Sequence, residues 1–311
     1  MRAWLGIDTS NYVTSAALVG ENGQVLYHGR QPLPVEHGAL GLRQSDAVFC
    51  HIRQIPALMR CAFEDAGKVT LAGVGVSTQP RKTEGSYMPV FLAGKAVADG
   101  VASAAGVPID YFSHQQGHIR AAEIGLQIPE TYLGVHLSGG TTELLKICQQ
   151  GYTAEILGAT QDIAAGQWVD RTGVKLGLDF PAGRALETLA CQTETAASFT
   201  VTVKGMDLFF SGAETQTKQA IEKGVAKEEI ARGVFVSLGR ALSKAIIRAH
   251  QATGLAYVLV AGGVSANQLV KTVVTERCAK MAKQLKVAFA DPLYAGDNAV
   301  GIALLAKETR C

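Results

Sequence analysis

Two histidines, His114 and His118, are the residues of this chain whose spacing most directly suggests chemistry. On a helix, residues four positions apart share one face, with their Cβ atoms about 5–6 Å apart. Two neutral imidazoles placed in this way can bind one metal ion and leave coordination positions open for a substrate oxygen. The alternative is that both rings are solvated at the start of an ordinary helix. Other residues of the chain are needed to distinguish between these two interpretations.

A carboxylate near the C-terminus supplies a candidate third ligand. Asp297 stands where the last helix is expected to start, and the ordinary role of an aspartate at such a position is to cap the helix. If that helix points into the same cleft as the histidine pair, Asp297 becomes an oxygen ligand, and two imidazoles with one carboxylate suit iron or zinc. His136, on an expected strand, is a further candidate ligand, with a core histidine as its alternative. The sequence thus predicts one iron or zinc ion per chain.

The elements expected around these residues occur twice in the same order. Each half opens with a buried strand and a hairpin, and Asn22-Gly23 is a strong hairpin signal in the first half. Alternating helices and strands follow in both halves, around a polar stretch at 191–212. The expected strands are 4–8, 14–18, 24–28, 71–77, 108–111, 132–138, 143–148, 152–157, 256–260 and 287–290. The expected helices are 45–66, 90–105, one containing the histidine pair, 163–176, 183–190, 213–223, 227–252, one from Ser265 and one from Asp297.

This repetition predicts an α/β protein made of two duplicated domains that face one cleft. We expect the N-terminal domain at residues 1–130 and the C-terminal domain, with inserted helices, at residues 131–311. The last helix could pack back on the N-terminal domain.

Three turns rich in small residues follow expected strands at related places. Their hydroxyls and glycine N–H groups offer hydrogen-bond donors to a phosphate without bulk, and a helix N-terminus adds a positive dipole end. The alternative is that the glycines only permit tight packing between strand and helix. Together the turns predict a nucleotide cleft. They are Asp8-Thr9-Ser10, then Ser138-Gly139-Gly140-Thr141-Thr142, and finally the segment from Val260 to Asn267, which contains Gly262 and Gly263 and in which Ser265 is expected to cap the next helix.

Composition excludes several classes of protein. With 48% hydrophobic and 18% charged residues, the 311-residue chain reads as a compact globular protein, and its net charge of +2 comes without a Lys/Arg run that would mark an RNA-binding segment. Its six cysteines lack CxxC spacing, which disfavours a zinc module and a disulfide framework. The N-terminus lacks the apolar core of a signal peptide, and no apolar run reaches the roughly 18 residues of a membrane span. We expect a cytoplasmic protein.

Seven segments, taken together, resemble a known family over essentially the whole chain. The chain is similar to the TsaD-type tRNA N6-threonylcarbamoyladenosine transferases, formerly described as O-sialoglycoprotein endopeptidases. The segments, in family order, are His114-x-x-x-His118 with Gly117, Ser138-Gly-Gly-x-Thr142, Ala164-Ala-Gly166-x-x-x-Asp170, Gly177-Leu-Asp-Phe-Pro181-x-Gly183, Phe210-Ser-Gly212, Ala261-Gly-Gly-Val-Ser-Ala-Asn267 and Asp297-Asn298.

The resemblance implies the actin/hexokinase/heat-shock ATPase fold. It also implies transfer of a threonylcarbamoyl group from metal-bound threonylcarbamoyl-AMP to N6 of adenosine 37 in tRNA, with a related actin-like subunit as a partner. By the family pattern, His114, His118 and Asp297 bind the metal, and His136 stands where some members place a tyrosine ligand. The adenylate residues implied are Thr142, Asp170, Gly183 and Asn267. Asp8 and Asp170 are our candidates for a general base.

Some residues depart from the family pattern, and they cluster where the acyl group or its acceptor should lie. Residues 11–13 are Asn-Tyr-Val where members carry acids, Thr141 fills the variable place of its turn, and residues 79–85 replace a glycine-rich loop. Ile163, Gln167 and Glu214 replace two acids and a lysine. A changed acceptor is therefore one hypothesis, and a partner protein that only scaffolds a related enzyme is another. A metallopeptidase would need a general base between the two histidines, where this chain offers only glutamines, and a sugar kinase has no use for the metal pair.

Overall fold

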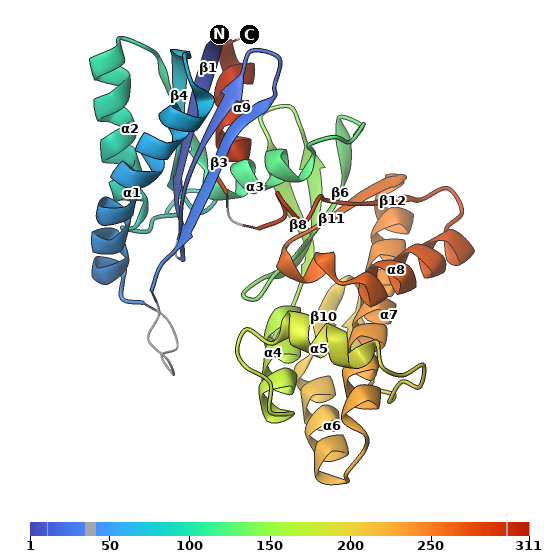
Figure 1. Cartoon of the computed structure of the whole chain (residues 1–311). Helices are drawn as coiled ribbons and strands as arrows, with labels where there is room; N and C mark the ends of the chain where they lie inside the picture. Colours follow the sequence, from blue (N-terminus) through green and yellow to red (C-terminus); the bar gives the residue numbers. More distant parts are fainter. Residues whose placement is uncertain (11, 35–41, 297, 311) are drawn as a thin grey trace. The chain divides into compact units, whose positions relative to one another are not determined.

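The computed structural model describes residues 1–10, 12–34, 42–296 and 298–310, and the chain divides into two compact units (Figure 1). Unit 1 comprises Met1–Ile124 and Gly296–Cys311, and unit 2 comprises Gly125–Ala295. The chain crosses from unit 1 to unit 2 near the expected boundary at 130/131. A second crossing at 295/296 brings the C-terminal segment back to unit 1.

Unit 1 is built on a five-stranded sheet with the strand order β3-β2-β1-β4-β5. The first three strands form an antiparallel meander, and β4 and β5 run parallel to β1. The expected hairpin around Asn22 is confirmed, with Gly23 at a φ of 81° in the turn. The strands are β1 (Arg2–Thr9), β2 (Val13–Gly20), β3 (Val25–Pro32), β4 (Thr70–Gln79) and β5 (Ile109–Ser113).

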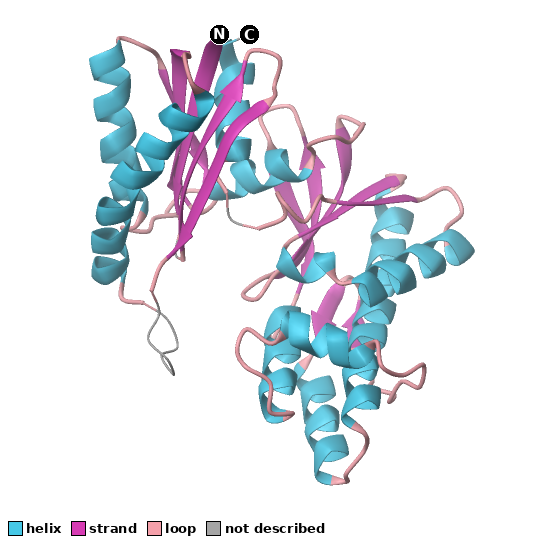
Figure 2. Cartoon of the chain, viewed as in Figure 1, coloured by secondary structure: helices cyan, strands magenta, loops and turns pink. Residues whose placement is uncertain are grey.

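Helices cover both faces of this sheet (Figure 2). Successive residues of a strand point to opposite faces, and β1 shows which helix covers which face. A Cβ atom added at Gly6 would meet α9 (Val300–Arg310) at Ala303, whereas Ile7 and Thr9 contact Gly94 of α2 (Phe91–Ala105). α1 (Gln44–Ala66) packs beside α2 against β2 and β3, and α3 (His114–Ala122) packs beside α9.

The α3–α9 contact depends on two glycines that let the helix backbones approach closely. A Cβ atom at Gly301 would overlap the carbonyl oxygen of Gly117 and lie 2.8 Å from the backbone nitrogen of Ala121. We expect Gly301→Ala to lower the free energy of unfolding by about 1–3 kcal/mol, because the helices must separate. Gly100→Ala, in the interior of α2 with no atom within 4 Å of the added Cβ, should instead stabilise by about 0.5–1 kcal/mol. Urea unfolding measures both, and equal effects would contradict the packing described.

Unit 2 repeats the sheet of unit 1 with the strand order β12-β11-β6-β7-β8. Again three antiparallel strands come first and two parallel strands join beside the first of them. The expectation of two duplicated α/β domains is therefore confirmed. The strands are β6 (Thr131–Leu137), β7 (Thr142–Cys148), β8 (Thr153–Ala159), β11 (Tyr257–Ala261) and β12 (Lys286–Phe289).

The helices of unit 2 enclose its main core, in which Trp168, Phe210 and Phe235 are at most 1% exposed. A small hairpin, β9 (Thr202–Lys204) with β10 (Asp207–Phe209), lies in the stretch where we expected no regular element. Strands of three residues are too short to show an alternating pattern in the sequence. None of the helices in the described ranges is long and apolar enough to cross a membrane. The helices are α4 (Ala165–Lys175), α5 (Gly183–Ala190), α6 (Ser211–Glu222), α7 (Lys227–Thr253), the 3-10 helix η1 (Gly263–Ala266) and α8 (Gln268–Met281).

Candidate functional site

A reciprocal cap at the end of β5 places the histidine pair. The Ser113 hydroxyl accepts a hydrogen bond from the backbone N–H of Gln116 at 3.2 Å, and the Gln116 side chain accepts one from the backbone N–H of Ser113 at 2.8 Å. This capping box starts α3 at His114, so that His114 and His118 occupy successive turns of one helix face.

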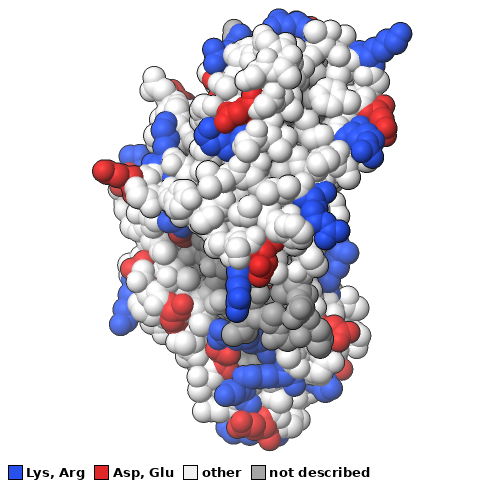
Figure 3. All heavy atoms as spheres, turned by 90° about the vertical axis from the view of Figure 1, so that its left-hand side faces the viewer, with Lys and Arg blue, Asp and Glu red and all other residues white. Residues whose placement is uncertain are grey.

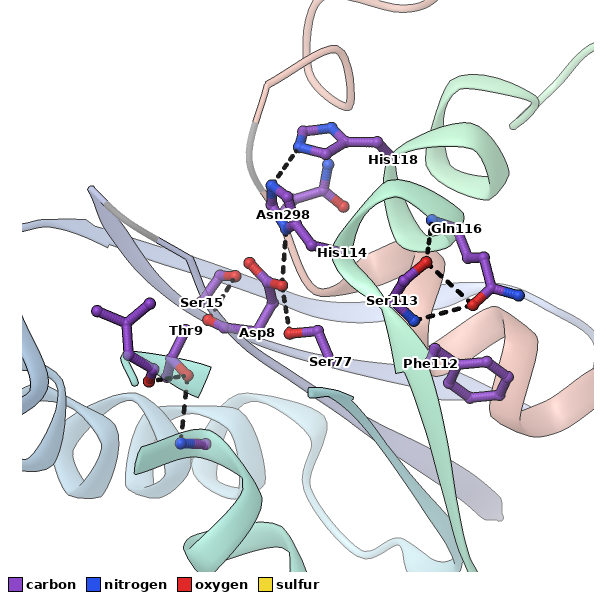
Figure 4. A network of polar contacts seen from close by, with 12 residues as sticks. Asp8, Thr9, Ser15, Ser77, Phe112, Ser113, His114, Gln116, His118 and Asn298 are labelled. Atoms are coloured by element: carbon purple, nitrogen blue, oxygen red, sulfur yellow. Dashed lines mark hydrogen bonds and ion pairs between the residues drawn. The ribbon is translucent and has the colours of Figure 1, made fainter. Parts of the chain in front are cut away.

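The two imidazoles converge at their Nε2 atoms, as the i, i+4 spacing predicted. These atoms lie 2.9 Å apart, and the rings stand nearly perpendicular, at 84° (Figure 4). Both nitrogens therefore point to one place.

Asp8, at the end of β1, orients the first of these rings. Its side chain is fully buried, and its Oδ1 accepts hydrogen bonds from Ser77 Oγ at 2.5 Å and from His114 Nδ1 at 2.8 Å (Figure 4). Because His114 donates through Nδ1, its Nε2 carries the lone pair, and in this tautomer the His118 Nε2–H donates to it. The other oxygen, Asp8 Oδ2, is buried and has no hydrogen-bond partner among the described residues.

A histidine that binds a metal usually donates its other ring N–H to a carboxylate or a similar acceptor. The donor set of unit 1 thus fits a transition metal, with two ring nitrogens converging and one of them backed by a buried carboxylate. Within the described ranges, no group of three His, Cys, Asp or Glu side chains is arranged to hold an ion. The predicted third ligand, Asp297, lies outside the described residues.

Asn298, the residue after Asp297, stands two residues before the last helix and bonds to the first residue of that helix. Asn298 Oδ1 accepts a hydrogen bond from Val300 N at 3.0 Å, and its Nδ2 donates to Gly296 O at 2.7 Å. The expectation that this helix starts at Asp297 was therefore wrong, because α9 begins at Val300. His136 lies in unit 2 on β6, opposite Glu143 of β7 and Ala261 of β11.

In unit 2, the turn from Ser138 to Thr142 is fixed by hydrogen bonds inside the turn and by one from α4. The backbone N–H of Thr141 donates to Ser138 Oγ at 3.0 Å, and Thr142 Oγ1 accepts from the backbone N–H of Ala165 at 2.9 Å. No atom lies within 4 Å of a Cβ added at Gly139 or Gly140. A ligand can therefore approach the backbone of both glycines closely.

The second turn of unit 2 lies against the end of β6. Gly262 has a φ of 102°, and a Cβ atom there would come 2.9 Å from Leu137 N, so that only glycine fits. Gly263 opens η1, and Ser265 Oγ donates back to Gly262 O at 2.7 Å. We expected Ser265 to cap the next helix, and this was wrong. The 3-10 turn comes first, and α8 starts only at Gln268.

Asn267 is the residue that caps α8. Its Oδ1 accepts a hydrogen bond from Val270 N at 2.9 Å, which fixes the side chain. Its Nδ2 is buried and has no hydrogen-bond partner among the described residues. A buried amide donor without a partner costs free energy unless a ligand satisfies it.

Asp170 organises the start of α5. Its Oδ1 accepts from Ala182 N at 2.9 Å, directly before Gly183. Burial raises the pKa of the Asp170 carboxyl above its usual value, although hydrogen bonds from the backbone N–H groups of Ala182 and Gly183 act in the opposite direction. Only Val169 Cγ1, at 3.9 Å, lies near a Cβ added at Gly183, which leaves open space at this position.

Glu187 belongs to this group, although the sequence analysis did not single it out. Its Oε1 accepts from the backbone N–H of Gln268 at 2.7 Å, which ties α5 to the first turn of α8 beside Asn267. The sequence could have indicated Glu187, because it stands four residues after Gly183 and so on the same helix face. Within unit 2, hydrogen bonds thus connect the segments that carry the proposed nucleotide residues: α4 to the turn at Thr142, Asp170 to the start of α5, and α5 to the start of α8.

Comparison with solved structures shows which known fold this chain has. The activator of 2-hydroxyisocaproyl-CoA dehydratase from Clostridium difficile, solved with bound ADPNP, superposes with a TM-score of 0.56 at 15% identity, covering 99% of this chain and 95% of its own. A ROK family glucokinase from Streptomyces griseus superposes with a TM-score of 0.54, also at 15% identity, over 98% and 99%. The fold is that of the duplicated actin-like ATPases and sugar kinases.

Sequence comparison identifies the family within this class. The family model "TsaD: tRNA N6-adenosine threonylcarbamoyltransferase" matches residues 42–304. A tRNA N6-adenosine threonylcarbamoyltransferase of Thermus thermophilus is 33% identical over 98% of this chain and 92% of its own length. The chain belongs to the TsaD family, as the resemblance of its motifs predicted.

Proposed function

We propose that this protein is a metal-dependent acyltransferase that moves a threonylcarbamoyl group from threonylcarbamoyl-AMP to N6 of adenosine 37 in tRNA, or a carbamoyl group to a changed acceptor. The observation that carries this proposal is the hydrogen-bonded arrangement of Asp8, His114 and His118 in a chain of the TsaD family. We also propose that it works in the cytoplasm, together with a related actin-like subunit.

Unit 1 has the metal-binding task in this proposal. His114 and His118 would hold iron or zinc through Nε2, and Asp297 would supply an oxygen. The ion would polarise the carbamoyl carbonyl as a Lewis acid. Asp8 keeps His114 in the tautomer that can bind, and its second oxygen is the one we would test as a general base.

Unit 2 has the task of holding the adenylate. The open backbone at Gly139 and Gly140 supports a phosphate position, because N–H groups there can donate to the departing AMP. The Asn267 Nδ2 donor and the open position at Gly183 support a position for adenine or ribose. Asp170, with its raised pKa, is the second candidate base.

The residues that depart from the family pattern support a changed acceptor side. Glu214, which stands where family members carry a lysine, pairs with Arg171 at 3.3 Å and with Lys175 at 3.9 Å. The carboxylate is therefore neutralised by α4. The lysine that family members carry at this position is therefore missing as a contact for a substrate. The alternative proposal is that the protein is a non-catalytic partner that binds nucleotide and metal.

Nucleotide binding can be tested with two substitutions that leave the fold intact. Asn267→Asp keeps an oxygen to cap α8 but removes the Nδ2 donor. Gly183→Leu places its side chain into open space. We expect each variant to bind AMP roughly 5- to 150-fold more weakly in calorimetry, since a lost hydrogen bond or an excluded ligand costs about 1–3 kcal/mol. Wild-type affinity in both, with unchanged unfolding curves, would put the nucleotide elsewhere.

A further inference from the structure

Positive charge is strongly segregated along this chain. Residues 230–286 contain nine Lys or Arg residues and a single acid, Glu276, whereas the rest of the chain contains 20 basic and 26 acidic residues. On the face shown in Figure 3, Lys and Arg lie among Asp and Glu, with a broad area free of charge between them. The whole protein is therefore nearly neutral, although residues 230–286 are strongly basic.

The helix α7 presents part of this charge as a stripe. Between residues 233 and 249 of α7, only four residues are not buried, and they are spaced four apart. They are Val236, Arg240, Lys244 and Arg248. Neighbours on such a stripe are separated by about 6 Å along the helix axis. Arg248 is used within the fold, because it donates to Gly205 O at 2.7 Å.

The helix α8 packs beside α7 (Figure 1). Its own basic residues add to the charge of the α7 stripe. Arg277 reaches from α8 to donate to Ser243 Oγ of α7 at 3.0 Å, which holds its guanidinium against α7 beside the residue that precedes Lys244. Lys280 follows one turn later and is exposed. Among the described residues, no acidic side chain pairs with any of these four cations.

We propose that the α7–α8 face, defined by Arg240, Lys244, Arg277 and Lys280, binds the phosphate backbone of RNA. Like charges at i, i+4 destabilise a helix, so an unpaired stripe of this kind costs stability unless an anion neutralises it. A polyphosphate supplies a row of such anions, and each contact releases a counterion from the nucleic acid. Two arginines and two lysines spread over adjacent helices match an extended partner better than a single small anion.

This inference rests on the proposed function, because it gives the RNA acceptor a docking surface on unit 2. Phosphate contacts of this kind fix the position of an RNA but read no bases. The face therefore contributes affinity, and recognition of the adenosine falls to other residues.

The test measures binding of the full chain to an unmodified tRNA transcript over a range of salt concentrations, without adenylate. Arg240→Gln/Lys244→Gln should weaken binding roughly 10-fold at about 150 mM salt and reduce the slope of log affinity against log salt by about 2. The matched control is Arg60→Gln/Lys68→Gln, which removes two exposed cations from unit 1 and should change neither quantity.

Unchanged affinity and slope in the α7 variant, or equal losses in both variants, would overturn the proposal. Loss of binding to anionic phosphatidylserine vesicles with RNA binding intact would assign the face to a membrane instead, and would also overturn it. A failure of the proposed transfer reaction is distinguishable, because it would appear as absent AMP release while RNA binding and its dependence on this face persist.

Discussion

His118→Ala should reduce the metal content of the purified protein from about one iron or zinc ion per chain to a trace, with the fold retained. The substitution removes one of the two Nε2 atoms that converge at 2.9 Å and leaves the Asp8–His114 pair unchanged. We expect His114→Ala and Asp297→Ala to have the same effect. Elemental analysis of the variants, with circular dichroism as the check of folding, measures it.

Two further variants sharpen this prediction. Asp8→Asn keeps the shape behind His114 but weakens the bond that sets its tautomer, so that metal affinity should fall about 10–100-fold. His250→Ala is the matched control, because the His250 ring lies 2.8 Å from Leu255 O at the end of α7 and takes no part in the site. A full complement of metal in His118→Ala would show that the two rings are not ligands.

Release of AMP from threonylcarbamoyl-AMP should depend on the metal. Removing the ion with EDTA should slow release roughly 100-fold or more, because Lewis-acid polarisation of a carbonyl contributes several kcal/mol to the transition state. Readdition of iron or zinc should restore the rate in the wild type and fail to do so in His118→Ala. An EDTA-treated protein that releases AMP at the original rate would contradict metal dependence.

Local patterns predicted much of this fold because they depend on neighbouring residues. Asn22-Gly23 predicted the first hairpin, and the order of strands in one half predicted the order in the other. The i, i+4 spacing predicted the shared face of His114 and His118 directly from helix geometry.

Features that depend on tertiary structure were not visible in the same way. The bond from His114 to Asp8 joins residues 106 positions apart, and Glu187 meets Gln268 across 81 positions. Neither pair leaves a periodic trace in the sequence. The start of α8 was misplaced because a 3-10 turn precedes it, and Ser265 and Asn267 are both residues that cap helices well.

The basic charge of the α7–α8 face likewise could not be predicted from neighbouring residues in the sequence. We found no Lys/Arg run in the sequence, and none exists, because Arg240 and Lys244 are separated by three buried residues. Arg277 joins them only when α8 packs on α7. A basic surface can therefore form from scattered residues when a helix is buried on every other side.

The most direct test of the proposed function mixes the protein with threonylcarbamoyl-AMP and unmodified tRNA, with and without a companion actin-like subunit, and follows AMP together with the modified nucleoside. We predict metal-dependent AMP release by the lone chain and little threonylcarbamoyladenosine, because we assign residues 79–85 and Glu214, which depart from the family pattern, to the acceptor side. Efficient modification by the lone chain would refute the changed acceptor and leave an ordinary transferase of the family. Absence of AMP release under every condition would contradict the proposal that this protein is an enzyme.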